Sequence, residues 1–348
     1  MIAHTTTNKT WSLATTEVPS VEGLTFRGFR GPEDYPAMVY IANRANRADG
    51  SDFVESVENL AAQYAHLINS DAATDLIVAE MKGEPIGYGR VWWHQVENGP
   101  RVYGHFAFLV PEWRGYAIRH TMLRHNEARL LAIARQHETE APRCYEVWAS
   151  ESETAWVTLL EQEGYTPARY SFEMVREHLN DIPDLPLPEG LTVRPVKPEM
   201  YQTVWHAARE AFRDHWGFSQ EEWADDNFES WQEQDTFTPE LWQVAWDGDE
   251  VAGMILNFIN EKENREYNRL RGYTETICVR RPYRRKGLAR ALIARSLKLH
   301  RELGMTEAAL GVDAENPNGA LQLYESMGFR TTKRFANYRK PFNVEAAE

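Results

Sequence analysis

The sequence has few cysteines, fewer basic than acidic residues, and no long hydrophobic run. It holds 348 residues, with 38 Lys and Arg against 52 Asp and Glu, so the formal net charge is −14. No stretch reaches the roughly 18 uninterrupted apolar residues that a membrane-spanning helix needs. The only cysteines, Cys144 and Cys278, lie far apart, which excludes a disulfide framework and a Cys-x-x-Cys metal or redox motif.

Further absences narrow the functional class. The first 23 residues are polar and Thr-rich and lack the charged-then-apolar pattern of a secretory signal, so we expect a cytoplasmic protein without a membrane partner. The acidic balance argues against a nucleic-acid partner, because such proteins depend on neutralising phosphates. The sequence contains neither a G-x-x-x-x-G-K-[ST] loop nor a G-x-G-x-x-G fingerprint, which excludes the common nucleotide-binding motifs.

The chain contains an internal repeat. Landmarks recur in the same order at offsets of 164 to 170 residues: EGLT at 22–25 and 189–192, LVPEWRG at 109–115 and VRRPYRR at 279–285, LLEQEGY at 159–165 and LYESMGF at 323–329. The period is far longer than that of a solenoid repeat, so it predicts two copies of one whole domain. Three prolines within residues 179–190 favour an extended linker. We therefore expect a polar tail at 1–23, a first domain at 24–178, this linker, and a second domain at 191–343.

Strands and helices are mixed within each copy. In the second copy the pattern predicts strands near residues 191–195, 241–246, 251–259, 273–279 and 308–312, and another from residue 329. Helices are expected within 201–231, from residue 288 to a C-terminal cap at Gly304, and over 319–327. This mixture predicts an α/β (α+β) fold in which helices flank a mixed central sheet.

The basic turn at residues 280–290 carries the clearest chemical signal. It stands between an expected strand and an expected helix, and small residues, Gly287 and Ala289, open that helix. Small residues allow a ligand to approach the main chain, and a helix N-terminus offers unpaired N–H groups. The context therefore favours a pyrophosphate site over a solvated basic turn or a nucleic-acid patch.

These motifs resemble the GNAT superfamily of acetyl-CoA-dependent N-acetyltransferases. The resemblance lies in the strand ending at Val279, in R-R-K-G-L-A at 284–289, and in Asn316, Ala320, Tyr324 and G-F at 328–329. The tandem arrangement resembles the mycothiol synthase group of two-domain GNAT enzymes. The resemblance implies acetyl-CoA as co-substrate, no metal, and a cofactor site that comprises Ile277, Val279, Arg284, Arg285, Lys286, Gly287, Leu288, Ala289, Asn316 and Ala320. Because the spacing from asparagine to Ala320 departs from the usual three residues, Asn316 or Asn318 could contact the cofactor.

Acetyl transfer to an amine needs a base and a proton donor for the departing thiolate. Tyr324 fits the donor, since a tyrosine hydroxyl can give a proton or a hydrogen bond. Glu275 is our candidate for the base, and strict alternation along its strand would place it on one face with Ile277 and Val279. Cys278 would fall on the opposite face, where a structural role is more common than an acyl-cysteine route.

The acceptor is expected to bind against the aromatic region 201–231. His206, Phe212, His215 and Trp216 are the candidate substrate residues, and Asp214 could attract a cationic acceptor. The identity of the amine and the oligomeric state cannot be read from the sequence.

The first copy departs from the motif at its chemical positions. Gly287 corresponds to Ala117, Ala289 to Arg119, Glu275 to His105 and Tyr324 to Leu160. The sequence therefore predicts a first domain without catalysis; whether it still holds CoA is open. The leading hypothesis is an N-acetyltransferase that acts on a small primary amine in a ternary complex, with catalysis in the second domain. A CoA-binding sensor or scaffold without turnover is the alternative.

Overall fold

The computed structural model describes residues 11–345, which form two compact units. Unit 1 comprises the described parts of Met1–Trp148, Ala155–Thr166 and Tyr338–Glu348, and unit 2 comprises Ala149–Thr154 and Pro167–Asn337. Residues 11–23 of the expected tail contain no helix or strand, and its first ten residues lie outside the described range.

Unit 1 is built on five strands that run in chain order across its sheet. Strands β1 to β4 pair antiparallel, and β5 pairs parallel with β4. The end of β12 follows β5. Its elements are β1 (Leu24–Arg27), α1 (Tyr35–Ala48), α2 (Val57–Ala65), α3 (Ala72–Asp75), β2 (Leu76–Met81), β3 (Glu84–Gln95), β4 (Arg101–Leu109), α4 (Ile118–Ala134), β5 (Arg143–Ser150) and α5 (Thr154–Gln162).

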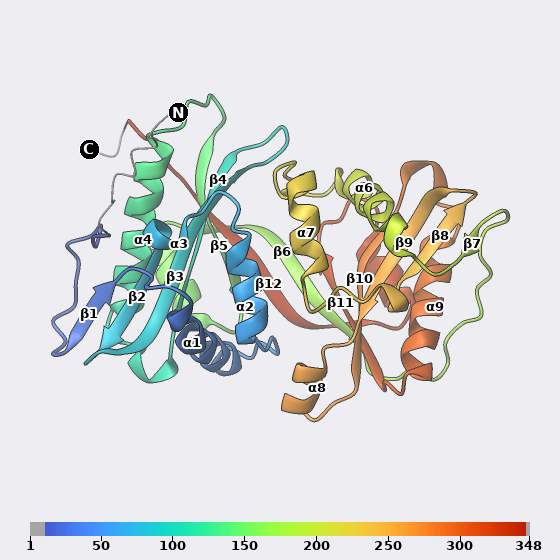
Figure 1. The fold of residues 1–348 in the computed structure, drawn as a ribbon, viewed down its shortest axis with the longest axis horizontal. Coiled ribbons are helices and arrows are strands. Elements are labelled where there is room, and N and C mark those ends of the chain that lie inside the picture. Colours follow the sequence, from blue (N-terminus) through green and yellow to red (C-terminus); the bar gives the residue numbers. More distant parts are fainter. Residues whose placement is uncertain (1–10, 346–348) are drawn as a thin grey trace. The chain divides into compact units, whose positions relative to one another are not determined.

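Unit 2 repeats this arrangement (Figure 1). Its strands follow the order β7-β8-β9-β10-β11-β6, with β10 and β11 parallel and the other neighbours antiparallel. Its elements are β6 (Thr166–Arg176), β7 (Thr192–Val193), α6 (Tyr201–Phe212), α7 (Phe228–Gln232), β8 (Gln243–Asp247), β9 (Glu250–Phe258), α8 (Glu261–Glu266), β10 (Arg271–Val279), α9 (Leu288–Glu302), β11 (Glu307–Asp313), α10 (Ala320–Ser326) and β12 (Arg330–Pro341). The expected α/β architecture is confirmed. The helical region expected within 201–231 contains α6 and most of α7, with a segment free of α-helix between them.

The compact units and the two sequence copies differ at their last strands. Strand β6 belongs to the first copy by sequence, yet from Pro167 onward it lies in unit 2 and pairs with β11. Conversely, the end of β12 lies in unit 1, where Arg339 bonds Glu146 at 2.6 Å and Lys340 bonds Glu127 at 2.8 Å. The chain therefore exchanges its terminal strands between units, which a linear division at residues 179–190 does not describe.

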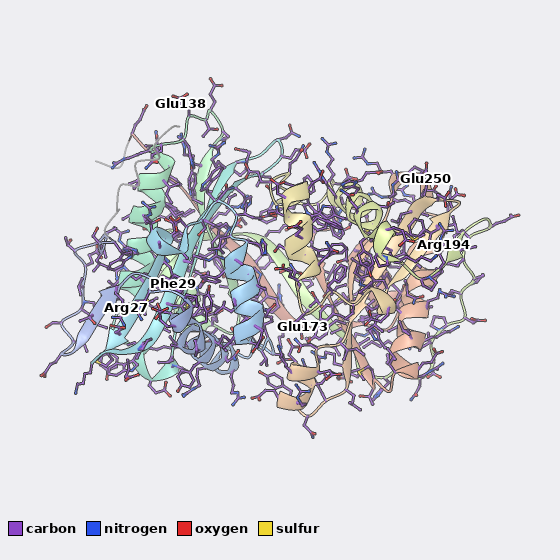
Figure 2. The ribbon with its side chains drawn as sticks, viewed as in Figure 1. Arg27, Phe29, Glu138, Glu173, Arg194 and Glu250 are labelled. Atoms are coloured by element: carbon purple, nitrogen blue, oxygen red, sulfur yellow. The ribbon has the colours of Figure 1, made fainter. Side chains whose placement is uncertain are left out.

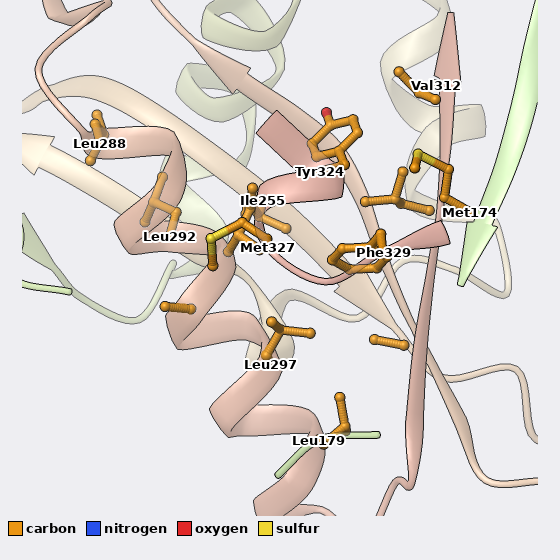
Figure 3. Packing of buried hydrophobic residues seen from close by; sticks show 14 of the residues in the cluster. Met174, Leu179, Ile255, Leu288, Leu292, Leu297, Val312, Tyr324, Met327 and Phe329 are labelled. Carbon is orange, nitrogen blue, oxygen red and sulfur yellow. The ribbon is translucent and has the colours of Figure 1, made fainter. Parts of the chain in front are cut away.

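Two apolar clusters cover the two faces of the sheet of unit 2. Alternate strand residues separate them, because successive side chains of a strand point to opposite faces. Ile255 packs with α9 and α10, whereas Met254 and Leu256 pack with α6. Figure 3 shows Leu288, Leu292 and Leu297 of α9 in the first cluster, with Met174 of β6 on its other side. Both faces are thus buried under helices, and the ends of β10 and β11 open toward the candidate site.

The Pro-rich segment 179–190 has no helix or strand. Its apolar side chains Leu179, Ile182, Leu185 and Leu187 pack against the α9 and α10 cluster. The segment is therefore an extended linker that packs on unit 2, rather than a flexible one. No helix in the described part of the chain is long and apolar enough to cross a membrane.

Gly272 on β10 provides a stability prediction. A Cβ atom at this position would lie 2.2 Å from Nδ1 of His300, which is fully buried on α9. We expect Gly272→Ala to lower the free energy of unfolding by about 1–3 kcal/mol, the usual cost of overpacking. Chemical denaturation measures this change. Combining Gly272→Ala with His300→Ala removes the clash, so the double variant should lose less free energy of unfolding than the two single variants lose together. A loss equal to their sum would contradict the explanation.

Candidate active site

Strands β10 and β11 separate near the centre of unit 2. Their parallel pairing covers Arg271–Tyr273 and Glu307–Ala309. Beyond it, Thr276 has a left-handed φ of 49°, and the register between β10 and β9 shifts by one residue. This β-bulge bends the strand and re-aims the side chains around it. The site is built in the opening that follows.

The bulge breaks the simple alternation of side chains between the two faces of β10 that the sequence predicts. Glu275 and Cys278 pair with β9 residues that are two positions apart, so they share a face by register. Ile277 and Val279 instead pack against the cluster under α9 and α10. The expectation that Glu275, Ile277 and Val279 share one face is therefore wrong, because one inserted residue reverses the alternation.

The turn after β10 has the backbone of an anion-binding loop. Arg285 and Gly287 have left-handed φ angles of 62° and 86°, and α9 begins at Leu288. Left-handed residues within such a turn direct main-chain N–H groups into one concavity, and the helix N-terminus adds the positive end of its dipole. The expected sequence of strand, turn and helix is confirmed here; the ligand stays a prediction.

Arg284 fastens this loop to the segment that follows helix α6. Its Nε donates to the carbonyl of Val279 at 2.9 Å, and its Nη1 donates to Oδ2 of Asp214 at 3.0 Å. Arg281 also bonds Asp214, and these hydrogen bonds lower the pKa of Asp214 to about 2. Two arginines thus occupy Asp214, so it is not the attractor for a cationic acceptor that the sequence suggested.

A cavity of about 730 Å³ lies in unit 2 over the β10–β11 opening. It brings together most of the predicted residues from four separate segments. The predicted residues that line it are Phe212, His215, Trp216, Glu275, Ile277, Val279, Arg284, Arg285, Gly287, Leu288, Ala289, Asn316, Ala320 and Tyr324. Lys286 and His206 do not line it: the ammonium of Lys286 lies over the ring of Tyr283, and His206 bonds Asp225 at 3.0 Å.

Glu275 is half-buried in the cavity wall, and its Oε1 accepts a hydrogen bond of 2.8 Å from the Gly311 amide on β11. Removal of water from around the carboxyl raises its pKa to about 8, and the nearby charge of Glu173 acts in the same direction. The Gly311 hydrogen bond opposes this shift only in part. A carboxyl with a pKa near neutrality can exchange protons during turnover.

Tyr324 packs its ring into the cluster under α9 and α10. Its hydroxyl points away from Met327 and Phe329 in Figure 3, and the residue lines the cavity. Burial and the neighbouring charge of Glu275 raise the pKa of Tyr324 above its usual range. The hydroxyl is therefore protonated at neutral pH, as a proton donor must be.

Cys278 also lines the cavity but is a weak candidate nucleophile. It is buried, and burial raises the pKa of its thiol to about 12. Since the thiolate is the reactive form, this environment disfavours an acyl-cysteine route.

The turn before α10 contains the two asparagines, Asn316 and Asn318, that are candidates for the cofactor contact. Oδ1 of Asn316 accepts a hydrogen bond from the main-chain N–H of Asn318 at 2.9 Å. The amide group of Asn316 therefore has its donor side available, whereas Asn318 is exposed. Both line the cavity, so the choice between them stays open.

The chain is similar to known acetyltransferases. The acetyltransferase (GNAT) family model matches residues 202–329, which include the anion-binding loop and Tyr324. A mycothiol acetyltransferase from Streptomyces bingchenggensis is 29% identical over 275 residues, 76% of this chain and 80% of that protein. Residues 202–329 therefore form a GNAT acetyltransferase domain, and the chain is an N-acetyltransferase.

Two solved structures extend the likeness to the whole fold of this acetyltransferase. A GCN5-related N-acetyltransferase from Sphaerobacter thermophilus has a TM-score of 0.68 at 24% identity, covering 92% of this chain and 96% of that one. A tandem GNAT protein from the clavulanic acid biosynthesis pathway has a TM-score of 0.63 at 13% identity, covering 91% and 98%. The expected tandem GNAT fold is confirmed. Members of this family use acetyl-CoA as their acyl donor.

Four further site residues lie on strands β6 and β12 and were not predicted from the sequence. Arg169, Tyr170 and Ser171 on β6, which belongs to the first copy by sequence, line the cavity of the acetyltransferase together with Asn337 on β12. The position of the β6 residues results from the strand exchange, which leaves no mark in composition or periodicity. The basic and aromatic character of residues 169–172 in the sequence was the only available signal.

The first copy keeps the backbone conformation of the anion-binding loop, but side chains fill the groove beside it, the region that corresponds to the cavity of the second copy. Gly115 and Ala117 have φ angles of 94° and 60°, which match the left-handed pair at Arg285 and Gly287. The guanidinium of Arg119, however, lies 3.9 Å from the ring centre of Trp156, and its Nε donates to the Ala107 carbonyl at 2.7 Å.

The two large side chains, Arg119 and Trp156, have alanine counterparts in the second copy. By the repeat offsets, Arg119 corresponds to Ala289, Trp156 to Ala320 and Ala107 to Ile277. Trp156 is buried, so the stacked pair fills the region that the second copy keeps open. Ala117 alone, which the sequence suggested as a defect, leaves the loop conformation intact.

Proposed function

We propose that the second copy transfers an acetyl group from acetyl-CoA to a small primary amine by direct attack in a ternary complex. The observation that carries the proposal is the meeting of three features in one cavity: the anion-binding loop, the Glu275 carboxyl and the Tyr324 hydroxyl. A volume of about 730 Å³ is within the range of small-molecule sites.

The donor half of the cavity suits a pantetheine diphosphate. The main-chain N–H groups of 284–289 would hold the diphosphate, while Ala289 leaves room for its oxygens. Arg285 and Arg290 line the cavity, and neither has a carboxylate partner among residues 11–345. The unpaired edge of β10 after Tyr273 can bond the pantetheine amides through Ile277 and Val279. Acetyl-CoA supplies the activated acyl group there.

The acceptor half places a base and an acid at the reacting centre. Glu275 takes a proton from the amine as its nitrogen forms the new bond to the acyl carbon. Tyr324 gives a proton or a hydrogen bond to the sulfur as the carbon–sulfur bond breaks. Phe212 and His215, with ring centres 4.5 Å apart, and Trp216 form an aromatic wall for the acceptor. The likeness to mycothiol acetyltransferases supports a small-molecule acceptor.

The proposal is tested by supplying acetyl-CoA with a panel of primary amines: an amino sugar, a polyamine, an aminothiol and a short peptide. Mass spectrometry should detect an acetylated amine together with free CoA. Binding of CoA without turnover of any amine would favour the sensor alternative. Absence of CoA binding would contradict both readings.

We also expect one CoA per chain, because the Arg119–Trp156 pair fills the groove of the first copy. Ala289→Arg installs in the second copy the residue that the first copy has. It should weaken CoA binding at least about tenfold, since a long side chain then competes for the diphosphate region. Isothermal titration measures both the affinity and the stoichiometry.

Arg119→Ala is the reciprocal control, and its stoichiometry should stay at one while Trp156 is present. A stoichiometry of two in the wild type would show that the first groove opens. Unchanged CoA affinity in Ala289→Arg would place the donor elsewhere. Thermal unfolding of each variant separates loss of binding from loss of folding.

A further inference from the structure

Arg169 lines the cavity and contacts residues on both its proposed donor side and its proposed acceptor side. It lies on β6, the strand that the first copy contributes, and its side chain is 15% exposed. Its Nε and Nη2 bond the two carboxylate oxygens of Asp313 at 2.7 Å each. Nη1 bonds Glu315 at 2.9 Å, and Nη2 also reaches the Glu315 carbonyl at 3.0 Å. The planar guanidinium thus holds the end of β11 in a fixed orientation.

The segment held in this way leads directly into the donor side. The main-chain N–H of Asn316 bonds the carbonyl of Asp313 at 3.1 Å, and the asparagine turn and Tyr324 follow. Ala314 bonds the carbonyl of Tyr170 at 3.0 Å, which ties the same segment to β6 a second time.

Arg169 also approaches the proposed acceptor wall. Its guanidinium carbon lies 5.8 Å from the ring centre of Trp216, within the range of a cation–π contact. Trp216 follows α6 in a segment without regular helix or strand, next to Gly217 at φ 75°. Arg281 and Arg284 hold this segment at Asp214, and Arg169 adds a contact at Trp216 itself.

We propose that Arg169 is a positioning residue for acceptor specificity: it fixes the Trp216 segment relative to the Asp313–Asn318 turn. This inference rests on the proposed function. It means that the first copy, although its own groove is filled, contributes to substrate selection through β6. A lysine cannot replace Arg169, because it lacks the two-pronged geometry that spans Asp313 and Trp216.

Arg169→Gln and Arg169→Lys should both raise the acceptor KM about tenfold or more, for the best amine of the panel. The Kd for CoA and kcat at saturating amine should stay within about threefold. Arg194→Gln is the matched control, since Arg194 also bonds an aspartate and stacks 4.7 Å from a tryptophan ring, but lies on the other edge of the sheet of unit 2. Figure 2 labels Arg194 at that edge and Glu173 on β6.

An acceptor KM within twofold of wild type in Arg169→Gln would overturn the proposal. Equal changes in CoA affinity and acceptor KM would also overturn it, because they indicate a general structural role. A second readout needs no turnover: with CoA bound, amide hydrogen exchange in residues 213–218 should be about tenfold faster in Arg169→Gln than in wild type. Unchanged exchange there would overturn the proposal, whereas failure of wild type to bind CoA would contradict the proposed function instead.

Discussion

Tyr324→Phe should lower kcat about 100-fold or more and leave the Kd for CoA within about twofold of wild type. The reason is that the variant keeps the ring, which packs in the cluster of α9 and α10, and loses only the proton donor for the departing thiolate. Steady-state kinetics with acetyl-CoA and the best amine, combined with isothermal titration of CoA, separates the two effects.

The folded state should tolerate this change. No residue between 11 and 345 forms a hydrogen bond with the Tyr324 hydroxyl, so its removal leaves no buried partner unpaired. Tyr283→Phe is the matched control: Tyr283 also lines the cavity, but its hydroxyl bonds Asp247 at 3.0 Å. Retention of kcat in Tyr324→Phe, or an equal loss in the control, would remove Tyr324 from the acid role.

The elements nearest to the chemistry were the most predictable from sequence. The basic turn, the helix starting at residue 288 and its C-terminal Gly304 were expected where they are found. Local rules are sufficient there, because a loop that presents its N–H groups and a helix cap each depend on a few adjacent residues. The repeat likewise predicted two domains of one architecture, and the comparisons with known folds agree.

The parts that were missed depend on non-local pairing. The bulge at Thr276 changes which side chains share a face, yet no glycine marks it in the sequence. The exchange of β6 and β12 is set by which strand edge each terminal strand meets. Periodicity gives the face of a strand but not its neighbour, so Arg169 could not be placed at the cavity.

In the first copy, too, the decisive feature is a contact between residues that are distant in the sequence. Ala117 is one of the departures from the motif, yet its φ of 60° keeps the left-handed conformation. The strain of a non-glycine residue at such an angle is small enough for the surrounding turn to impose it. The groove is filled instead by Arg119 and Trp156, residues 37 positions apart that only the fold brings together.

Glu275→Gln should remove most of the activity and change its dependence on pH. In the wild type, kcat/KM for the amine should fall below about pH 8 more steeply than the ionisation of the amine alone requires, because only the deprotonated carboxyl can accept the proton. The glutamine variant keeps the hydrogen bond acceptor for Gly311 but cannot act as a base. We expect a loss of about 100-fold above pH 8, and a residual profile that follows the ionisation of the amine alone.

Glu173→Gln tests whether a nearby charge contributes to the raised pKa of Glu275. The charge of Glu173 raises the pKa of Glu275, so its removal should shift the wild-type profile to lower pH without loss at the plateau. Superimposable profiles of wild type and Glu275→Gln would exclude Glu275 as the base.

The raised pKa of Glu275 also predicts how the stability of the protein depends on pH, and this prediction can be tested without an acceptor substrate. The folded protein holds the proton of Glu275 up to about pH 8, whereas the unfolded chain releases it near 4.5. Between these values the folded state binds more protons, so this residue makes the wild type less stable as pH rises. Glu275→Gln lacks this contribution, and its melting temperature relative to wild type should therefore increase from pH 5 to pH 8.5. A constant difference over that range would mean that the carboxyl ionises normally in the fold, and the base assignment would then lose its electrostatic support.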